Sequence, residues 1–547
     1  MVDTCGAEFE AVSPYYYSTY DEVTDAQPSQ NKKVLVIGSG PIRIGQGIEF
    51  DYCSVHAVWA LKKLGYETII ANNNPETVST DFDTSDVLYF EPLTDEDVEN
   101  IVETEKPMGA IVQVGGQTAI KLTQALADMG VPILGSQPDS VDAAEDRKRF
   151  DEVLEKCGVP RPAGRTIFTT EEALQAAAEL QYPVLLRPSY VLGGQGMEIA
   201  YNDKDVVEFM SIIQRTVQEH PILVDKYMMG TEIEVDAICD GDDILIPGIM
   251  EHVERAGVHS GDSISVYPSI SLSPSIQAVI MEATKKLAKA LNVIGLVNIQ
   301  YVLYKSRIYV IEVNPRSSRT VPYISKVTGV PMVEVAVRTM FGEKLRDMPY
   351  GTGLYPTSHY HAVKAPVFSF EKLHNVDTNL GPEMKSTGEV LGVAKSLEDA
   401  LLKAITATNV KLPQPGSDII ITVRDSDKED ILPMARYFAQ NGFHIYATQG
   451  TAKLLNSQGI HAEEVFTIDV GSPNVLDILH RGNTGLVINT PTRGRKPERD
   501  GFRIRRKTVE CSVPCLTSLD TANAMIRCMQ LHKQPGDLEV VNLNSIT

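Results

Sequence analysis

Leu296-Val-Asn-Ile-Gln-Tyr-Val302, Lys305-Ser-Arg307 and Ile308-Tyr-Val-Ile-Glu-Val-Asn-Pro-Arg316 follow one another and decide the fold of the chain. The first and third stretches alternate apolar and polar residues with a period of two, which predicts two β-strands joined as a hairpin. On the first strand Asn298 and Gln300 share a face. On the second strand Glu312 and Asn314 share a face, which by the same alternation is also the face of Val310 and Ile308.

The length of the hairpin loop decides which polar residues meet. A three-residue loop, 305–307, would place Gln300 opposite Glu312 and Asn298 opposite Asn314. Such a patch of side-chain oxygens suits a hard cation such as Mg²⁺. Arg316 follows just past the strand and would meet an anion that the metal also meets. We therefore expect a metal–phosphate site for nucleotide chemistry.

Two alternatives stay open at this point. A two-residue turn would shift the pairing by one and place Gln300 opposite an apolar residue. The stretch could also be an amphipathic hairpin whose polar face is simply solvated, because strand alternation alone does not require a ligand.

The bulk composition is that of an ordinary soluble protein. The 547 residues predict roughly three or four domains. Asp and Glu outnumber Lys and Arg by 72 to 50, and the formal net charge of −22 argues against broad binding to nucleic acid or to an anionic membrane. The seven cysteines lack the regular spacing of a disulfide framework. The sequence shows no apolar signal region and no apolar run long enough to span a membrane. A reduced cytoplasmic compartment is therefore expected.

Residues 31–145 predict a small, doubly wound α/β domain. A buried-strand pattern at 33–38 leads into a Gly-rich loop, a helix near 51–64 and a second strand at 67–71. Dinucleotide binding is the obvious hypothesis, but Arg43 stands where the G-x-G-x-x-G fingerprint needs its last glycine. Asparagines at 72–74 also replace the acidic residue that would hold a ribose, so the fingerprint fails.

The first 30 residues precede this domain and predict an arm. Tyrosines at 15–17 and 20 form an aromatic cluster in a polar segment, and disordered segments are poor in aromatics. We expect the arm to pack on another surface, such as that of a partner chain.

Residues 146–345 hold most of the candidate nucleotide-binding side chains. Arg147 begins a helix, and Arg187 ends a short strand directly before the glycines of 191–197. Glycines let backbone N–H groups approach phosphate oxygens, so these residues predict a flexible flap. Because a guanidinium fits phosphate geometry, Arg187 favours phosphate contact over an ordinary turn.

The next strands of this region carry further candidates. The strand at 222–228 ends at Lys226 and Met228, a possible edge for adenine. Beyond it one strand face is acidic, with Glu232 first, which is either solvated or available to ribose hydroxyls. A polar, Gly-rich loop at 257–262 contains His259, which could donate to a phosphate, although a lone loop histidine is more often incidental.

A mixed segment, 346–410, and a linker at 413–417 lead to a second α/β unit, residues 411–547. There the turn Thr448-Gln-Gly-Thr451 precedes a helix, where hydroxyls and free N–H groups form a natural anion site. Arg493, Arg495 and Lys496 make the most basic local patch. The patch is either a solvated loop or, together with the two threonines, a site for a phosphorylated effector.

These stretches together resemble one family, the carbamoyl-phosphate synthase large subunit, and specifically its C-terminal half. The resemblance covers nearly the whole chain and rests on seven motifs in one order. They are Gly-Gln-Gly-Ile-Glu-Phe-Asp-Tyr-Cys (45–53), Asn-Pro-Glu-Thr-Val-Ser-Thr-Asp (74–81), Arg-Pro-Ser-Tyr-Val-Leu-Gly-Gly (187–194), Glu-Val-Asp-Ala-Ile-Cys-Asp-Gly (234–241), Gly-Val-His-Ser-Gly-Asp (257–262), Ile-Glu-Val-Asn-Pro-Arg (311–316) and Leu-Gly-Pro-Glu-Met-Lys-Ser-Thr-Gly-Glu-Val (380–390).

The resemblance implies an α/β protein with a pre-ATP-grasp domain (31–145), an ATP-grasp domain (146–345), the end of the synthetic region (346–410) and a methylglyoxal-synthase-like allosteric domain (411–547). The arm, 1–30, would be a remnant of an oligomerisation region. The implied reaction is phosphorylation of carbamate by MgATP to give carbamoyl phosphate and ADP, which feeds pyrimidine and arginine biosynthesis. Carbamate would arrive through an internal tunnel from a first ATP-grasp half on a separate polypeptide, and ammonia from a small glutamine amidotransferase subunit.

The resemblance also implies roles for residues at matching positions. Gln300, Glu312 and Asn314 would bind two Mg²⁺ or Mn²⁺ ions, with K⁺ as a further candidate ion. Arg316 would orient carbamate and stabilise the transferred phosphoryl group. The nucleotide contacts would be Arg147, Arg187, Lys226, Met228, Glu232, Gly257, Val258, His259, Ser260, Gln300 and Glu312. These roles suit phosphoryl transfer, which needs positioning and cations around the phosphoryl oxygens more than a base.

The chain departs from the family pattern at several positions. Lys226 stands where the family often has His, and the following hinge is one residue shorter. In the terminal domain Thr448, Gly450 and Thr451 match the UMP phosphate site, but a basic residue expected near Thr467 is absent. A carboxylate of the ornithine site is missing near Ala365, although Glu254 and Asp262 match, so ornithine activation is not expected.

Two rival functions are compatible with these residues. One is a stand-alone ATP-grasp ligase that activates a different carboxylate, which the missing first half suggests. The other is a nucleotide-binding regulatory subunit without chemistry, against which the intact set of Gln300, Glu312, Asn314 and Arg316 argues.

Overall fold

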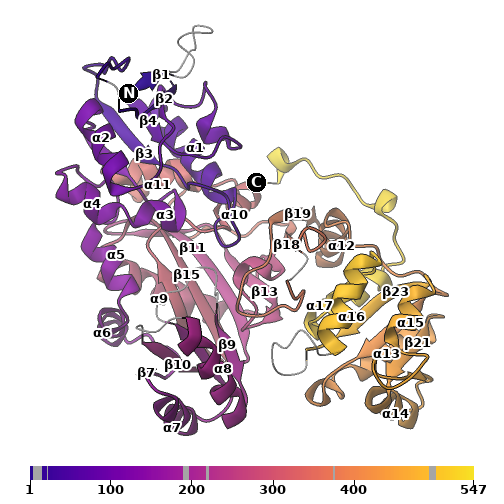
Figure 1. The fold of residues 1–547 in the computed structure, drawn as a ribbon. Helices are drawn as coiled ribbons and strands as arrows, with labels where there is room; N and C mark the ends of the chain where they lie inside the picture. Colours follow the sequence, from indigo (N-terminus) through magenta and orange to yellow (C-terminus); the bar gives the residue numbers. More distant parts are fainter. Residues whose placement is uncertain are drawn as a thin grey trace.

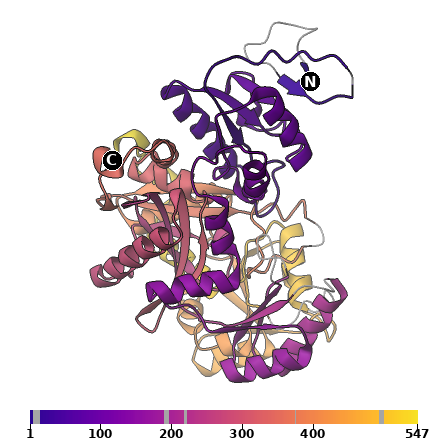
Figure 2. The ribbon, with the colours of Figure 1, turned by 90° about the vertical axis from the view of Figure 1, so that its left-hand side faces the viewer.

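The computed structural model describes residues 1–3, 15–20, 22–188, 196–216, 221–373, 376–491 and 500–546. Predictions for residues 191–195 of the Gly-rich flap and for Arg493, Arg495 and Lys496 lie outside these ranges. Each part of the described chain contains both helices and strands, and the strands form four sheets, which confirms the α/β fold class (Figure 1). Figure 2 shows the first domain and the small sheet with its helices at opposite ends of the large sheet.

The first sheet is parallel except for one edge pair, and its strand order is β1-β2-β5-β4-β3-β6. Its strands are β1 (Val2–Asp3), β2 (Tyr15–Tyr17), β3 (Lys33–Ile37), β4 (Glu67–Ala71), β5 (Val87–Tyr89) and β6 (Gly109–Ile111). Its helices are α1 (Glu49–Lys63), α2 (Asp95–Glu105), α3 (Gly116–Ile120), α4 (Thr123–Asp128) and α5 (Pro138–Glu145). The predicted strand–loop–helix–strand unit is therefore present within a few residues of its expected bounds.

The tyrosine arm packs on this chain's own first sheet. Residues 15–17 form β2, which pairs in parallel with β5. Tyr16 is buried, and its ring centroid lies 5.4 Å from that of Tyr89. The aromatic cluster predicted a packed arm, and the surface that it finds is an extension of the neighbouring sheet.

A small antiparallel sheet follows, in the order β7-β10-β8-β9. Its strands are β7 (Gly164–Ile167), β8 (Val184–Pro188), β9 (Glu198–Ala200) and β10 (Ile222–Lys226). The helices of this part are α6 (Arg147–Cys157), α7 (Thr170–Leu180) and α8 (Asp203–Thr216). Apolar residues of α7 and α8 form a separate core with these strands, so the sheet is a folding unit of its own.

The large sheet has the order β16-β15-β11-β13-β14-β18-β19, with β12 and β17 attached beside β11. Its strands are β11 (Thr231–Asp240), β12 (Ile244–Ile246), β13 (Ile249–Arg255), β14 (Ser265–Tyr267), β15 (Ile294–Tyr304), β16 (Arg307–Asn314), β17 (Gly353–Leu354), β18 (His361–Val367) and β19 (Gly388–Ala394). Its helices are α9 (Pro274–Ala290), α10 (Val321–Thr328), α11 (Met332–Met340) and α12 (Leu397–Ala407). The sheet thus continues well past residue 345.

Burial separates the two faces of this sheet. One face carries Val235, Ile299 and Val310 into a core with α6 and α9. The other face is apolar at one end of the strands and polar at the other. Ile238 and Leu296 pack under α10 and α11 at the apolar end, and Asp236 and Asn298 begin the polar end. A strand alternates its faces every residue, so this change fixes which end of the sheet can hold a polar site.

The hairpin of β15 and β16 differs from the expectation in two respects. Its loop has two residues, Lys305 and Ser306, both with left-handed φ angles of 50° and 63°, and Tyr304 pairs with Arg307. This two-residue turn would have moved Gln300 onto an apolar partner, but the register shifts between Gln300 and Tyr301. The shift is a β-bulge, in which one extra residue restores Gln300 opposite Glu312.

The bulge also corrects the predicted face of the second strand. Ile311 and Glu312 are both exposed, whereas Ile308, Val310 and Val313 are buried in the core. Glu312 therefore does not share a face with Ile308 and Val310. The extra residue at 311 turns the strand over, so the expected pairing is present although the loop and the alternation differ from those predicted.

The C-terminal domain has a parallel sheet in the order β22-β21-β20-β23-β24. Its strands are β20 (Asp418–Thr422), β21 (His444–Thr448), β22 (Glu463–Val465), β23 (Thr484–Asn489) and β24 (Cys515–Leu516). Its helices are α13 (Leu432–Gln440), α14 (Gln449–Ser457), α15 (Val475–His480), α16 (Asp500–Glu510) and α17 (Leu519–Gln530).

Helix α17 belongs to two cores. Leu519, Ala522 and Met525 pack with the sheet of the C-terminal domain. Ala524 and Cys528 pack instead with β14, β18 and α12 of the preceding part. The last domain is thereby attached to the large sheet by a shared helix (Figure 1). Within the described residues, no helix is long and apolar enough to cross a membrane.

Deleting Ile311 should test the bulge. The deletion restores strict alternation and leaves Gln300 opposite Glu312, so we expect the free energy of unfolding to change by about 1 kcal/mol or less, since the residue is exposed. Deleting Val313 should cost about 3 kcal/mol or more, because it empties a core position and turns Asn314 toward the apolar face. Chemical denaturation of both variants measures the difference, and equal losses would contradict the bulge.

Candidate nucleotide and metal site

Three neighbouring strands bring polar side chains together on one face of the large sheet. Gln300 of β15 lies opposite Glu312 of β16 and Glu234 of β11. Asn298, two residues earlier, lies opposite Asn314 and Asp236. Directly opposed residues of antiparallel strands point to the same side, with Cβ atoms about 5 Å apart. The predicted patch of oxygen ligands is therefore formed.

Asn298 connects this patch to the buried carboxylates beneath it. Its amide nitrogen donates to Glu234 Oε1 and to Asp236 Oδ1, both at 2.9 Å. The amide of Asn314 donates in turn to Asn298 Oδ1 at 3.5 Å. Thr320 Oγ1 donates to Glu234 Oε1 at 3.1 Å and also contacts Asp236. These bonds hold the strands' polar side chains in one register.

The carboxylates on β11 are nearly inaccessible to water and perturb one another. Burial raises the pKa of Glu232 to about 7, and the charges of Glu234 and Glu312 add to the increase while His252 opposes it. Burial likewise raises the pKa of Asp236, with Glu234 as the next cause. For Glu234, burial is outweighed by the imidazole of His252, so its pKa is lowered. Burial thus opposes the ionisation of Glu232 and Asp236, whereas His252 favours the ionised form of Glu234.

His252 was not predicted from the sequence, and it lies between two of these carboxylates. Its Nε2 is 3.4 Å from Glu234 Oε2, and its Nδ1 is 3.8 Å from Glu232 Oε1. Burial lowers the pKa of the imidazole, but the bond to Glu234 and the two charges raise it further, so the net direction is up. No clear signal in the sequence marks this histidine, since β13 has polar residues at 251, 252, 254 and 255 and therefore no period of two.

Arg316 lies at the junction of the first domain and the large sheet. Its Nη2 donates to Asn314 Oδ1 at 3.1 Å, and its Nε donates to Gln117 Oε1 at 3.2 Å. Gln117 lies in the first turn of α3, the helix that follows β6 at the carboxyl end of the first sheet. Burial lowers the pKa of the guanidinium, and the carboxylate of Glu312 opposes that. The predicted catalytic arginine is therefore fixed beside the oxygen patch.

The small sheet brings Arg147 and Arg187 together through a residue that the sequence did not single out. Arg147 Nη2 lies 2.7 Å from Asp225 Oδ1, and Arg187 Nε lies 3.1 Å from Asp225 Oδ2. A Cβ atom on Gly164 would overlap both Asp225 and Arg147, so only glycine admits this approach. Two guanidinium groups sharing one carboxylate keep a net positive charge, as an anion site requires.

Lys226 and Met228, at the end of β10, are placed differently from these arginines. The Lys226 ammonium donates to the backbone oxygens of Gln181 at 2.8 Å and Tyr182 at 3.2 Å. Met228 follows the strand, and its carbonyl accepts from Gly230 N at 2.9 Å. Both residues thus lie at the strand's edge, with the lysine side chain bound to local backbone.

The predicted loop at 257–262 packs against the metal patch. Gln300 Nε2 donates to Ser260 Oγ at 3.1 Å. Gly257 has a φ of 106°, and a side chain there would overlap the ring of Tyr227, so glycine is required. Val258 and His259 are half-buried between them, and burial lowers the pKa of His259. The structure thus joins this loop to Gln300, as the nucleotide-site hypothesis needs.

The residues present fit a hard divalent cation. Gln300, Glu312 and Asn314 offer amide and carboxylate oxygens on one sheet face, and such cations prefer oxygen ligands. In the described part of the chain no three His, Cys, Asp or Glu side chains form a metal cluster. Only one of the three predicted ligands is of those types.

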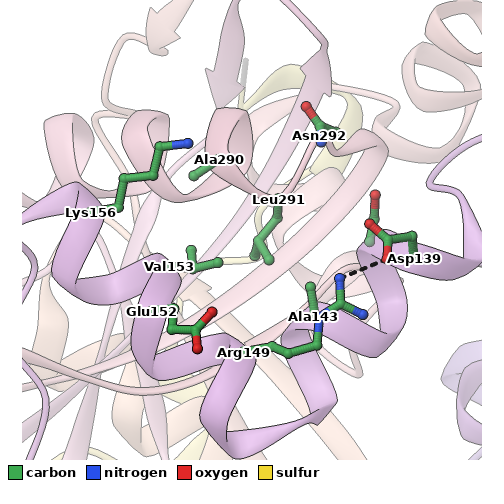
Figure 3. A pocket seen from close by; sticks show the side chains of 10 residues that line it. Asp139, Ala143, Arg149, Glu152, Val153, Lys156, Ala290, Leu291 and Asn292 are labelled. Carbon is green, nitrogen blue, oxygen red and sulfur yellow. Dashed lines mark hydrogen bonds and ion pairs between the residues drawn. The ribbon is translucent and has the colours of Figure 1, made fainter.

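Two hollows lie away from this patch. One, of about 240 Å³, is bounded by α5, α6 and the end of α9, and Arg149 there is paired with Asp139 at 2.7 Å (Figure 3). It contains none of the predicted site residues. The other, of about 130 Å³, lies in the C-terminal domain at the end of β20, β21 and β23. It is lined by Thr422, Val423, Thr448, Thr467, Val475, Asn489, Thr490, Asp500, Gly501 and Ile504.

This second hollow contains part of the predicted anion site. Thr448 is the N-cap of α14, and Thr451, in its first turn, is buried. A Cβ atom on Gly450 would lie 3.0 Å from Lys428 Nζ, so a cation stands beside the helix N-terminus. Lys428 was not predicted.

Known proteins match the chain along most of its length. Residues 30–143 match the carbamoyl phosphate synthase preATP-grasp domain, 146–348 the carbamoyl-phosphate synthase L chain ATP-binding domain, and 430–517 the MGS-like domain. The carbamoyl phosphate synthase large chain of Lachnoclostridium phytofermentans is 61% identical over 546 residues, which are 100% of this chain and 51% of that protein. The large chain of Agathobacter rectalis is 59% identical over 99% of this chain and 51% of its own length.

The chain belongs to the carbamoyl phosphate synthase large-chain family. It spans about half the length of the curated relatives that it matches. The resemblance inferred from seven motifs is confirmed, as are the pre-ATP-grasp, ATP-grasp and MGS-like domain types.

Solved structures support the fold of the first two domains of this family member. The biotin carboxylase domain of Hydrogenobacter thermophilus 2-oxoglutarate carboxylase superposes with a TM-score of 0.54 at 19% identity, covering 69% of this chain and 90% of that one. Biotin carboxylase from Campylobacter jejuni gives 0.53 at 16% identity, covering 69% and 91%. At such identities the likeness establishes the fold alone.

Replacing Glu232 by Gln should stabilise the nucleotide-free protein by an amount that grows as the pH rises. The folded carboxyl keeps its proton up to about pH 7 whereas the unfolded one loses it near 4.5, so its ionisation destabilises the fold as pH rises through this window. Glutamine imitates the protonated form. We expect a gain of about 1 kcal/mol for the variant at pH 5, where the unfolded carboxyl is already mostly ionised, and of about 3 kcal/mol at pH 8.5. Urea denaturation at both values measures this.

The control is Glu282→Gln on the exposed side of α9, which repeats the isosteric change away from the cluster. If Glu232→Gln were more destabilising at pH 8.5 than at pH 5, the raised pKa would be wrong.

Proposed function

We propose that this chain phosphorylates carbamate with ATP to give carbamoyl phosphate and ADP, as one half of a glutamine-hydrolysing carbamoyl-phosphate synthase. The observation that carries the proposal is the pairing of Gln300 with Glu312 and of Asn298 with Asn314, with Arg316 bonded to Asn314. Family membership supports it, since the relatives carry this activity in their name. Carbamoyl phosphate then serves pyrimidine and arginine biosynthesis.

In this proposal the chain's residues divide the work of phosphoryl transfer. A carbamate oxygen attacks the terminal phosphorus of ATP, a new P–O bond forms, and the bond to the β-phosphate oxygen breaks, which releases ADP. Gln300, Glu312 and Asn314 would hold divalent cations, Mg²⁺ or Mn²⁺, whose charge would offset that of the phosphates. Arg316, fixed by Gln117 and Asn314, orients the carbamate and stabilises the transferred phosphoryl oxygens.

The nucleotide contacts are proposed on both sides of this patch. Arg147 and Arg187 would bind the phosphates. Without nucleotide, both arginines pair with the carboxylate of Asp225 instead. The remaining proposed contacts are Lys226, Met228, Glu232, Gly257, Val258, His259 and Ser260. A nucleotide held between the small and large sheets would be shielded from water, which suits a labile substrate such as carbamate.

Partners and regulation belong to the same proposal. The other half of the large subunit would supply carbamate, and a small glutamine amidotransferase subunit would supply ammonia. A phosphorylated effector such as UMP would bind the hollow beside Thr448 and Thr451, near Lys428. K⁺ as an additional ion and a cytoplasmic location complete the proposal.

Replacing Glu312 by Ala should abolish the chemistry, because it removes the carboxylate ligand. The assay is ATP formation from MgADP and carbamoyl phosphate, the reverse of the proposed step, and we expect a loss of about 10³-fold. Ile311→Ala, at the neighbouring exposed position of the same bulge, is the matched control and should keep its activity.

Two results would reject the proposal. Unchanged activity in the Glu312 variant would remove the metal assignment. A wild-type chain that binds MgADP but forms no ATP from carbamoyl phosphate would favour a ligase for another carboxylate.

A further inference from the structure

The turn that follows β6 is bonded to the backbone on both sides of Arg316. The side chain of Gln113 is buried in this turn, and its Nε2 donates to the backbone oxygen of Pro315 at 2.9 Å. The backbone oxygen of Gln113 accepts from the N–H of Ser317 at 2.8 Å. Ser317 Oγ donates in addition to the backbone oxygen of Val114 at 3.1 Å. The residues before and after Arg316 are therefore both hydrogen-bonded to the first domain.

Gln113 is itself fixed between the first domain and the large sheet. Its Nε2 also donates to Ser136 Oγ at 2.8 Å, and that hydroxyl is bonded to the backbone of Ile294 at the start of β15. A Cβ atom on Gly135 or on Gly295 would overlap the side-chain oxygen of Gln113, so glycines at these two positions admit the glutamine. The buried amide thus joins the two domains directly behind Arg316.

Gln117, four residues further on, holds the side chain of the same arginine. Its Oε1 accepts from Arg316 Nε at 3.2 Å, and its Nε2 donates to Glu145 Oε1 at 2.8 Å. An ionised carboxylate can only accept hydrogen bonds, so Glu145 takes the amino side of the Gln117 amide and leaves its oxygen for the guanidinium. Glu145 is the last residue of α5. This second contact is therefore also fixed from within the first domain.

The contacts of Arg316 leave a definite set of donors for a ligand. A guanidinium has five N–H donors in one plane. Nε donates to Gln117, Nη1 to the backbone oxygen of Ser317 at 2.9 Å, and Nη2 to Asn314 Oδ1 at 3.1 Å. Among the described residues no other acceptor contacts these nitrogens, so one N–H remains on each terminal nitrogen. Two such donors match the two oxygens of a carboxylate.

We propose that Gln113 and Gln117 are positioning residues for the phosphoryl transfer, which act through Arg316 and not on the substrate. Gln113 fixes the backbone from which the arginine extends. Gln117 fixes the plane of the guanidinium, so that the same two N–H groups are always free for the carbamate. The first domain thereby contributes to the chemistry of the large sheet. The inference deepens the proposed function and rests on it for its effect on turnover.

The first test measures the guanidinium itself and needs no substrate. Phenylglyoxal modifies arginine side chains, and peptide mass spectrometry gives the rate at each arginine. In Gln117→Met, which keeps the length of the side chain but neither hydrogen bond, Arg316 should react about 5-fold faster than in the parent. In Gln117→Glu, which keeps the acceptor, Arg316 should react no faster than in the parent. Arg319 is the internal reference, because it pairs with Glu49 at 2.6 Å instead.

Gln124→Met is the matched control, because this exposed glutamine of α4 bonds to Asp128 of its own helix at 2.8 Å. An unchanged rate at Arg316 in Gln117→Met, or an equal increase at Arg319, would overturn the role of Gln117. Gln113→Met should likewise increase the rate at Arg316, and an unchanged rate would overturn the role of Gln113. If that variant does not fold, Gln113→Asn takes its place, since it keeps a buried amide that is one methylene too short for Pro315.

The second test measures turnover in ATP formation from MgADP and carbamoyl phosphate. In Gln117→Met kcat should fall about 10-fold and the KM for carbamoyl phosphate should rise, while the KM for MgADP stays within about 2-fold. A merely structural role would reduce the amount of active enzyme and leave both KM values as they are. An unchanged KM for carbamoyl phosphate, or equal changes in both, rejects the positioning role. If the parent binds MgADP without forming ATP, the proposed function fails, and the phenylglyoxal rates still decide whether the two glutamines hold Arg316.

Discussion

Antiparallel pairing of β15 with both of its neighbours is the constraint on which the rest of the structure depends. The pairing fixes Gln300 between Glu234 and Glu312, and Asn298 between Asp236 and Asn314. A slip by one residue would turn every one of these side chains into the core under α9 and expose that core's valines and isoleucines. Burial of the apolar face therefore fixes the register of the strands, and that register places the polar side chains of the site on the opposite face.

The polar face also brings several carboxylates close together where water has little access. Glu232, Glu234 and Asp236 are all nearly inaccessible to water, and the imidazole of His252 lies between two of them. Burial, and to a smaller extent the like charge of Glu234, raises the pKa values of Glu232 and Asp236. Cations bound above them would relieve that repulsion. Ionised carboxylates in this position are unfavourable without a cation, and relief of that repulsion would contribute to the affinity for a divalent ion.

The sequence determined the fold where one short-range signal was sufficient. Alternation gave β15 and β16, and the Gly-rich loop after 33–38 gave the first βαβ unit. The bulge was not predictable, because the choice of Ile311 or Glu312 as the extra residue depends on packing against a core that other segments supply. A two-residue turn by itself predicts an apolar partner for Gln300, because no local sequence signal indicates a compensating bulge.

Site residues divide in the same way. Gln300, Glu312 and Asn314 could be grouped because they lie on two adjacent strands. Asp225, which joins Arg147 to Arg187, could not, since that contact spans 78 residues and depends on the close approach at Gly164. Gln113 and Pro315 are 202 residues apart and belong to different domains, so no pattern in either segment could pair them.

Helix α17 has a consequence for how such proteins can change. Its residues fill the interior of the last domain on one side and cover β14, β18 and α12 on the other. An ancestor that exchanged this C-terminal domain for another could not have cut the gene at the linker and joined a foreign sequence, because the preceding part would have lost the helix that covers it. Recombination would succeed only if the incoming module brought a helix of matching shape, so the two parts are expected to be inherited as one unit.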